Sequence, residues 1–301
     1  MKIKTLGIAS AAGGHHHGGR KAQESYFKYF LGTQPTHSFG IKCFHARRHY
    51  KLKQLFQQIH HTTQRWARQD QAFLVVEGDH SSAMGTWSGV LDSLSTNESL
   101  GLIWLDAHMD AHTFHSSPSG NIHGMPIAAL LGAEDTRLKK LYPGKRHLAP
   151  ENLIIIGLRS YEAQEQALLD SLGVEYYDLS SIPAKGGLNS LLEQAVQRLS
   201  KRCTKVGLSI DLDVLDPRDA PGVATPVAKG IRSAGLIHAL KKALKKTQLC
   251  GLEISEYVPD KDPDGRTLKL LGKLVDTTYP SNENKFLGSS RLGRRSMLLP
   301  N

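Results

Sequence analysis

Cysteine is scarce in the 301-residue sequence, and no hydrophobic run is long enough to cross a membrane. The three cysteines, Cys43, Cys203 and Cys250, are far apart and odd in number, which favours reduced thiols in a cytoplasmic protein. The apolar part of residues 1–14 is too short for a signal peptide, so we expect an N-terminal strand there. Linkers rich in proline or serine, repeats and low-complexity segments are also missing. The chain is therefore predicted to be one domain spanning residues 1–301.

Aromatic residues make up only 7% of the chain, and they are not interleaved with basic residues as a nucleic-acid stacking surface requires. The formal net charge is nevertheless +10, which would suit an acidic partner. The densest basic run, KKALKK at 241–246, lies on a segment with the apolar spacing of an amphipathic helix, and it fits a solvated helix face. We therefore expect neither a nucleic-acid partner nor a membrane partner.

Apolar runs of strand length alternate with longer segments of helical period. This alternation is typical of a parallel sheet buried on both faces, which predicts the α/β class. The expected strands are 3–8, 41–45, 72–78, 100–108, 152–159, 174–179, 205–213 and 250–258. The expected helices between them include 50–69, 161–172, 187–201 and 233–246.

Acids and histidines gather at the C-terminal ends of four predicted strands. The segments are EGDHS (77–81), DAHMD (106–110), DLDVLD (211–216) and SEY (255–257). Ligand sites of parallel α/β sheets form just outside these strand ends. Four separated segments therefore deliver polar side chains to one edge of the sheet.

Six of these side chains have the chemistry of metal ligands. Alternation along an extended segment predicts one shared face for the ligands of 106–110 and another for those of 211–213. Each residue alone fits a hydrogen-bonded strand end or a turn, but two imidazoles and four carboxylates together suit a pair of octahedral ions such as Mn²⁺. Such a pair can generate hydroxide for a hydrolytic reaction. The residues are His80, Asp106, His108, Asp110, Asp211 and Asp213.

The motifs EGDHS, DAHMD and SIDLDVLDP resemble the signature motifs of the ureohydrolase family, which includes arginases, agmatinases and formimidoylglutamases. The resemblance continues through SPSGNIHGMP (117–126), APGVATPV (220–227) and EISEYVP (253–259), in the family's order and with similar spacing. It implies a three-layer αβα sandwich around a central, mainly parallel sheet, in agreement with the class predicted above. It also implies a homo-oligomer, commonly a trimer or a hexamer.

The resemblance further implies a centre of two manganese ions per chain, with a hydroxide between the ions that attacks a guanidinium carbon. One ion would be held by His80, Asp106, Asp110 and Asp211. The other would be held by Asp106, His108, Asp211 and Asp213, so that Asp106 and Asp211 bridge the pair.

Three further residues match reacting or substrate-binding groups of the family. Glu256 matches a glutamate that pairs with the guanidinium, since a planar carboxylate forms charge-assisted bonds with such a group. Thr225 matches a threonine near that glutamate. His123 matches a histidine that shuttles protons, a task that suits an imidazole near neutral pH.

The segment SPSGNIHGMP is similar to the loop of arginases, in which Ser119 and Asn121 would bind the α-carboxylate of the substrate. The segment GLRSYEAQE (157–165) matches the arginase loop for the α-amino group, with Glu162 and Glu165 at its two acidic positions. The resemblance is therefore closest to the arginases, and it implies hydrolysis of L-arginine to L-ornithine and urea.

Three positions depart from the family pattern. Glu77 replaces the usual first glycine of the GGDHS motif and is expected to add a charge near the metal ions. His112 stands where arginases usually carry an asparagine that touches the substrate carboxylate, and Glu162 stands where an aspartate is usual. These changes leave agmatine, another guanidino acid or a formimidoyl compound open as the substrate. A non-catalytic basic binding protein on the same fold is a more remote alternative.

Other segments only imitate sites. The run GGHHHGGR at 13–20 is expected to be a flexible entry or surface loop beside the site. The segment 260–265 imitates a calcium loop, but Pro263 interrupts it and the twelfth position is Leu271, so a turn before a helix is expected. His115 breaks the alternation and is assigned no ligand role.

Four histidines without acidic neighbours in the sequence are expected at the surface: His45, His49, His60 and His61. The segment 289–300 fits either an interface arm or a loose tail.

Overall fold

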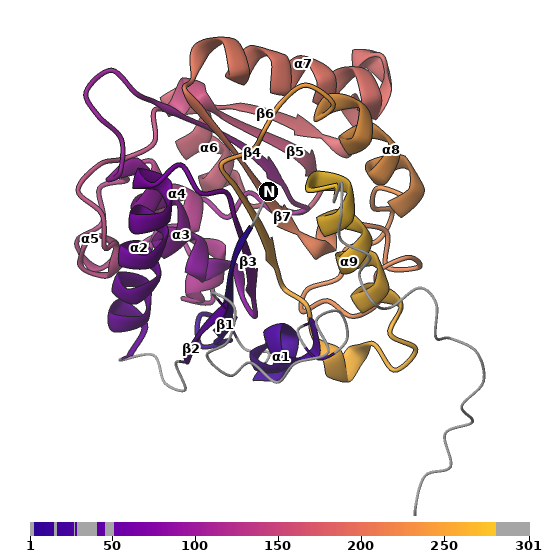
Figure 1. Cartoon of the computed structure of the whole chain (residues 1–301), viewed down its shortest axis with the longest axis horizontal. Coiled ribbons are helices and arrows are strands. Elements are labelled where there is room, and N and C mark those ends of the chain that lie inside the picture. Colours follow the sequence, from indigo (N-terminus) through magenta and orange to yellow (C-terminus); the bar gives the residue numbers. More distant parts are fainter. Residues whose placement is uncertain (1–2, 15–16, 27, 29–40, 46–50, 281–301) are drawn as a thin grey trace, which may run out of the picture.

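Eight parallel strands form one sheet in a computed structural model of the chain (Figure 1). Within the described residues, the strand order is β2-β1-β3-β8-β7-β4-β5-β6. The structure describes residues 3–14, 17–26, 28, 41–45 and 51–280. The strands are β1 (Lys4–Ala9), β2 (Ile41–His45), β3 (Phe73–Glu77), β4 (Leu100–Leu105), β5 (Leu153–Leu158), β6 (Glu175–Asp178), β7 (Lys205–Asp211) and β8 (Gly251–Ser255).

Helices cover both faces of this sheet, which confirms the three-layer αβα sandwich (Figure 1). One buried core joins the sheet to α2, α3 and α4, and a second core joins its other face to α7, α8 and α9. No helix in the described part of the chain is long and apolar enough to span a membrane. The helices are α1 (Ala22–Tyr26), α2 (Leu52–Arg68), α3 (Ala83–Leu91), α4 (Pro126–Leu130), α5 (Thr136–Leu141), α6 (Ala163–Leu172), α7 (Gly187–Arg202), α8 (Ser233–Ala243) and α9 (Arg266–Thr278).

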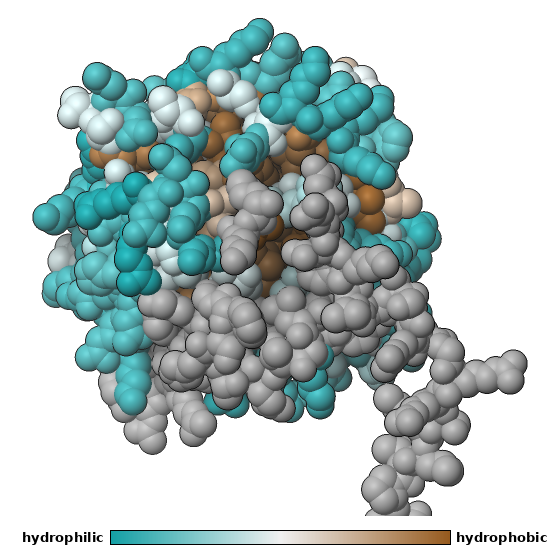
Figure 2. Space-filling model, in the orientation of Figure 1, coloured by the Kyte–Doolittle hydropathy of each residue, from teal (hydrophilic) through white to brown (hydrophobic). Residues whose placement is uncertain are grey.

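Burial explains why these segments take these forms. Every residue of β3, β4 and β5 is buried, as expected for strands covered on both sides. Helix α2 instead buries one stripe, which begins with Leu52, Leu55, Phe56 and Ile59 at helical spacing. Hydrophilic side chains cover the outer faces of α2 and α7 (Figure 2).

The eight expected strands and the four expected helices are all present, with ends that shift by a few residues. The largest differences are early ends, since β4 stops at Leu105, α8 at Ala243 and β8 at Ser255. The segment 260–265 lies directly before α9, as expected. Asp262 accepts hydrogen bonds from the backbone of Thr267 and Leu268, and thereby caps the first turn of α9.

The strand order places the functional segments side by side. The four strands that end in acids and histidines, β3, β8, β7 and β4, are direct neighbours in the middle of the sheet. Because all four strands are parallel, their C-terminal ends meet at one edge. This edge carries the candidate site.

Candidate metal centre and substrate pocket

The first metal group consists of one histidine and three aspartates at the strand ends. His80 Nδ1 lies 3.3 Å from Asp106 Oδ2, 3.2 Å from Asp110 Oδ2 and 3.1 Å from Asp211 Oδ2. All four side chains are buried, and their facing atoms lie within 4.8 Å of one another. The structure thus brings together four residues from the ends of β3, β4 and β7.

This group fits a divalent cation. His80 Nδ1 and Asp110 Oδ2 are buried without a hydrogen-bond partner. A buried polar atom without a partner costs about 1–3 kcal/mol, so the folded chain needs something that satisfies both atoms. One imidazole nitrogen and three carboxylate oxygens form a hard donor set that suits an ion such as Mn²⁺.

The second metal group contains Asp106, His108 and Asp213. His108 Nδ1 lies 3.2 Å from Asp213 Oδ2 and 3.6 Å from Asp106 Oδ1. Asp106 therefore turns one oxygen toward each group, which is the arrangement of a bridging carboxylate. Asp211 is not part of this second group, although its Oδ1 accepts a hydrogen bond from the Asp213 backbone at 2.9 Å.

Strand alternation does not explain these two groups, and that part of the sequence prediction is wrong. Asp106, His108 and Asp110 follow the end of β4, and Asp110 has a left-handed backbone with φ of 48°. Asp213 lies in a 3-10 turn, and its backbone N–H donates to the side chain of Asp211, which caps the turn. The side chains converge because irregular loops turn them inward, so the residues were grouped correctly for an incorrect reason.

Burial and neighbouring charges shift the pKa values within the first metal group. Burial, together with the charge of Asp106, raises the pKa of Asp110 to about 6. Burial opposes the ionised form of Asp106 as well, but the neighbouring imidazoles of His108 and His80 lower the pKa of that carboxyl. Burial also raises the pKa of Asp211 well above its usual range, and the three facing aspartates raise the pKa of His80 although burial opposes a charged imidazole. A divalent ion that binds here would therefore displace protons from the group.

Glu256 and His123 form a pair beside the first metal group. Glu256 Oε1 accepts a hydrogen bond from the His80 backbone at 2.9 Å and lies 3.2 Å from His123 Nδ1. Burial alone would lower the pKa of His123, but its bond to Glu256 raises that pKa to about 10. Glu256 also has a left-handed backbone, with φ of 63°. Such strain is concentrated at functional sites.

Gly13 and Gly14, in the described part of the segment 13–20, pack against His123. His123 donates its backbone N–H to Gly13 at 3.0 Å, and a Cβ on Gly14 would lie 3.3 Å from the His123 ring. Residues 17–21 form a 3-10 helix, and a Cβ on Gly19 would lie 2.4 Å from the carbonyl oxygen of Gly78. These described parts of the segment are packed rather than loose, because glycine lets two backbones approach closely.

A third polar group occupies the expected substrate-binding end. His112 Nε2 lies 2.9 Å from Glu162 Oε2 and 3.3 Å from Glu165 Oε2. His112 Nδ1 lies 3.1 Å from Ser116 Oγ, so both ring nitrogens have partners. Burial raises the pKa of Glu165 to about 8, and its carboxylate also accepts the Ala111 backbone N–H at 3.0 Å.

The remaining predicted pocket residues are less enclosed. Ser119 is exposed and its Oγ accepts the backbone N–H of Asn121 at 3.2 Å. Thr225 donates to Asp213 Oδ2 at 2.9 Å, and so contacts the second metal group directly. His115 is exposed, 3.9 Å from Asp135, and lies in neither metal group.

Two expectations from the sequence are corrected by burial. Glu77 does not place a charge at the rim of the site, because its side chain is completely buried and this burial raises its pKa well above the usual range. His60 is not a surface residue, since it is buried between α2 and α3, 3.0 Å from Ser88 Oγ and 3.5 Å from Asp92 Oδ2. His61 is exposed as expected. The side chains of His45 and His49, like the segment 289–300, lie outside the described residues.

A model of the arginase family matches residues 17–279 of the chain. The chain belongs to the arginase family. It is therefore a hydrolase of the class that acts on guanidino and amidino groups.

Individual relatives agree with this assignment. The chain is 38% identical to the arginase of Brevibacillus brevis over 206 residues, which cover 68% of each protein. It is 39% identical to the arginase of Bacillus subtilis (strain 168) over 204 residues, covering 68% of this chain and 67% of that protein. The crystal structure of arginase from Bacillus subtilis superposes with a TM-score of 0.83 at 29% identity, covering 93% of this chain and 99% of that one. A formimidoylglutamase structure from the same species shares the fold at 20% identity, with a TM-score of 0.73.

Several residues that support the site in this arginase-family chain were missed from the sequence. Trp104 stacks on the His80 ring at 4.2 Å and donates to Asp106 Oδ2 at 2.9 Å. The Arg159 guanidinium donates to five backbone carbonyls within residues 213–215 and 227–228 and to that of Gly157, which fixes the loop that carries Asp213. The only hint of them in the sequence was position, since the Trp104 indole lies within an apolar strand and the Arg159 guanidinium directly after one.

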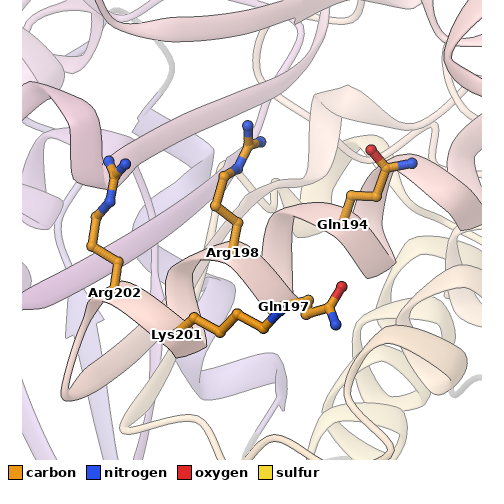
Figure 3. A pocket seen from close by; sticks show the side chains of 5 residues that line it. All are labelled: Gln194, Gln197, Arg198, Lys201 and Arg202. Atoms are coloured by element: carbon orange, nitrogen blue, oxygen red, sulfur yellow. The ribbon is translucent and has the colours of Figure 1, made fainter.

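A surface hollow lies away from this site. It measures about 450 Å³ and lies on the outer face of α7, where long polar side chains line it (Figure 3). Arg198 is paired with Glu175, and Arg202 donates to the carbonyl of Glu151. With these cations engaged and no buried polar group in its lining, the hollow has the character of a solvated helix face.

Proposed function

We propose that this arginase-family chain hydrolyses L-arginine to L-ornithine and urea with two Mn²⁺ ions. The observation that carries the proposal is the pair of adjoining metal groups that share Asp106, next to the Glu256–His123 pair. The first ion would bind His80, Asp106, Asp110 and Asp211. The second would bind Asp106, His108 and Asp213, with Asp211 as the second bridge.

The metal pair, when bound, makes water reactive near neutral pH and stabilises the charge that develops during hydrolysis. The chain's own residues orient the substrate. Glu256 is ionised and buried, and its carboxylate would pair with the planar guanidinium through charge-assisted hydrogen bonds. This pairing would compete with the bond between Glu256 and His123, and so free the imidazole to face the substrate.

His123 would then handle the proton. Its Nδ1 faces Glu256, where the guanidinium is proposed to bind, so its proton can pass to the departing amine. The raised pKa keeps this imidazole protonated while Glu256 remains its partner. Replacing that partner with a cationic substrate lowers the pKa toward the range in which an imidazole both gains and loses a proton.

The substrate tail would lie against Ser119, Asn121, His112, Glu162, Glu165 and Thr225. Because His112 already contacts both acids, the binding of an α-amino group there would have to rearrange this cluster. Agmatine and other guanidino or formimidoyl compounds therefore remain competing substrates within the proposal.

Urea release by the Mn²⁺-loaded full chain tests the reaction, with L-arginine, agmatine and other guanidino acids compared at equal concentration. Turnover of L-arginine supports the proposal. Turnover of agmatine alone would overturn the carboxylate-binding assignment. No release from any substrate, together with salt-sensitive nucleic-acid binding, would favour the basic binding protein instead.

We further propose a cytoplasmic homo-oligomer built from one domain. Cys203 and Cys250 are unpaired thiols, which suits a reducing compartment. All metal-group residues lie at or directly beyond the ends of strands of one sheet, which supports a single domain. Light scattering of the purified chain would test for the trimer or hexamer.

A further inference from the structure

A row of polar side chains crosses the sheet face that packs against α3. Glu253 of β8 is in register with Ser209 of β7 on one side and with Val75 of β3 on the other. Glu77 comes two residues after Val75 and therefore points to the same face of the sheet. Three neighbouring strands thus place Glu77, Glu253 and Ser209 beside one another, behind His80.

Hydrogen bonds connect this row to the His80 ring. Ser209 Oγ donates to Glu253 Oε2 at 2.8 Å and lies 2.9 Å from His80 Nε2. Since the hydroxyl hydrogen of Ser209 is directed at the carboxylate, Ser209 must accept a hydrogen from His80 Nε2. The tautomer is thereby set, and the lone pair of His80 Nδ1 faces the first metal group.

The carboxyl oxygens at the far end of this row lack hydrogen-bond partners. Both oxygens of Glu77 and Oε1 of Glu253 are buried without a hydrogen-bond partner. Both side chains have no exposed surface, and oxygens of the two lie within 4.8 Å of each other and of the His80 ring. Two ionised carboxylates cannot remain side by side in such a place without compensation.

A shared hydrogen satisfies these atoms better than a cation does. His80 Nε2 is already engaged by Ser209, so a cation would find ligands from only Glu77 and Glu253, far fewer than Mg²⁺, Ca²⁺ or Mn²⁺ require. One hydrogen between the two carboxyl groups removes one negative charge and gives the unpaired Glu253 oxygen a donor. Glu253 is the better anion of the two, because Trp87 Nε1 also donates to its Oε2 at 2.7 Å.

We propose that Glu77 is a neutral carboxylic acid that donates a hydrogen bond to Glu253, and that this carboxyl pair, acting through Ser209, holds His80 in position for metal binding. Glu77 and Ser209 are positioning residues, since they act on the ion only through His80. The inference rests on the metal centre of the proposed function, and its tests do not measure turnover.

Infrared spectroscopy of the metal-free full chain tests the acid itself. At neutral pH, the wild type should show carbonyl bands of buried protonated carboxylic acids, among them Glu165 with its pKa of about 8, and Glu77→Gln should lack one of these bands, that of Glu77. Glu134→Gln makes the same change at a side chain that is 88% exposed and should leave the band in place. Identical carboxylic acid bands in the wild type and Glu77→Gln would overturn the proposal.

Calorimetric titration with Mn²⁺ tests the positioning. Ser209→Ala should weaken binding at the first metal group about 10–100-fold, the usual effect of losing a partner behind a ligating histidine. Glu77→Leu should weaken it in the same direction, whereas Glu77→Gln should stay close to the wild type because its amide still donates to Glu253. Thermal melting without metal checks that each variant folds. If Glu77→Leu does not fold, the test rests on Ser209→Ala.

The outcomes separate this inference from the proposed function. Equal Mn²⁺ affinity in the wild type, Ser209→Ala and Glu77→Leu would overturn the positioning role. A third bound ion that Glu77→Gln abolishes would mean that a cation joins the carboxylates. Absence of any Mn²⁺ binding by the wild type would instead overturn the metal centre, and the infrared band would still decide whether Glu77 is an acid.

Discussion

Removal of one carboxylate from the second metal group should reduce, but not abolish, the stabilisation of the fold by Mn²⁺. The two groups contain four buried aspartates, and burial raises the pKa of Asp110 and Asp211, so the charges of these two oppose folding when no cation is present. Mn²⁺ binds the folded chain alone, because these ligands come from three strands that are together only in the native sheet. Mn²⁺ should therefore raise the melting temperature.

The size of the effect follows from mass action. Each ion at a hundred times its dissociation constant stabilises the fold by about 2.7 kcal/mol, so two ions contribute about 5.4 kcal/mol. For a chain of this size, 1 kcal/mol corresponds to about 2 °C, which predicts a shift of about 10 °C in the wild type. Asp213 supplies an oxygen only to the second metal group, so Asp213→Ala should retain about half of the shift.

Differential scanning fluorimetry with and without Mn²⁺ measures these shifts. Asp213→Ala also removes the acceptor of Thr225, which costs about 1 kcal/mol in the metal-free fold, so each variant is compared with its own metal-free curve. Asp219→Ala is the matched control, because Asp219 pairs with Arg232 and belongs to neither metal group. The reasoning fails if Asp213→Ala shows the full wild-type shift, or if Asp219→Ala loses as much as Asp213→Ala.

Three further predictions concern the pocket and its protons. Glu256→Gln should lower urea release at least about 100-fold, because the amide loses the charge that pairs with a guanidinium, while the Mn²⁺ shift persists; retained activity would remove Glu256 from the reaction. Glu162→Asp should change the preference among guanidino substrates with little change in metal content by atomic absorption, and an unchanged preference would place Glu162 outside the pocket. Affinity for Mn²⁺ should fall as the pH drops below about 6, where protons compete for Asp110, and calorimetry showing constant affinity across that range would contradict this. The stability of the metal-free fold should depend on pH in the opposite direction. Because the pKa of Asp110 is raised, its contribution to stability is lost as the pH rises between 3.8 and about 6.

Much of the fold was predictable because burial leaves a periodic pattern in the sequence. Continuous apolar runs marked β4 and β5 as strands covered on both faces, and the helical spacing of apolar residues marked α2. The exact end of β4 was not predictable. The residues after Leu105 keep an alternating pattern, yet the left-handed backbone at Asp110 comes from the loop contacts around it.

The burial of single polar residues was the least predictable feature. His60 has no acidic neighbour in the sequence, but the packing of α2 on α3 brings Asp92 to within 3.5 Å of it. Glu77 ends an apolar strand as a rim residue would, and only the neighbouring β8 determines that it faces Glu253 in the interior. Contacts between residues far apart in the sequence decide such cases, and local patterns do not contain them.

The sequence by itself determined the α/β class, the strands that end in acids and histidines, and the motifs of the family. These are local properties, because apolar periodicity and short polar motifs each occupy one segment of the chain. Only the tertiary structure decided that β3, β8, β7 and β4 are neighbours, that Asp106 turns one oxygen toward each metal group, and that His112 contacts both Glu162 and Glu165. Strand order and desolvation are set by packing between distant segments, so the chemistry of the site is encoded locally while its geometry is not.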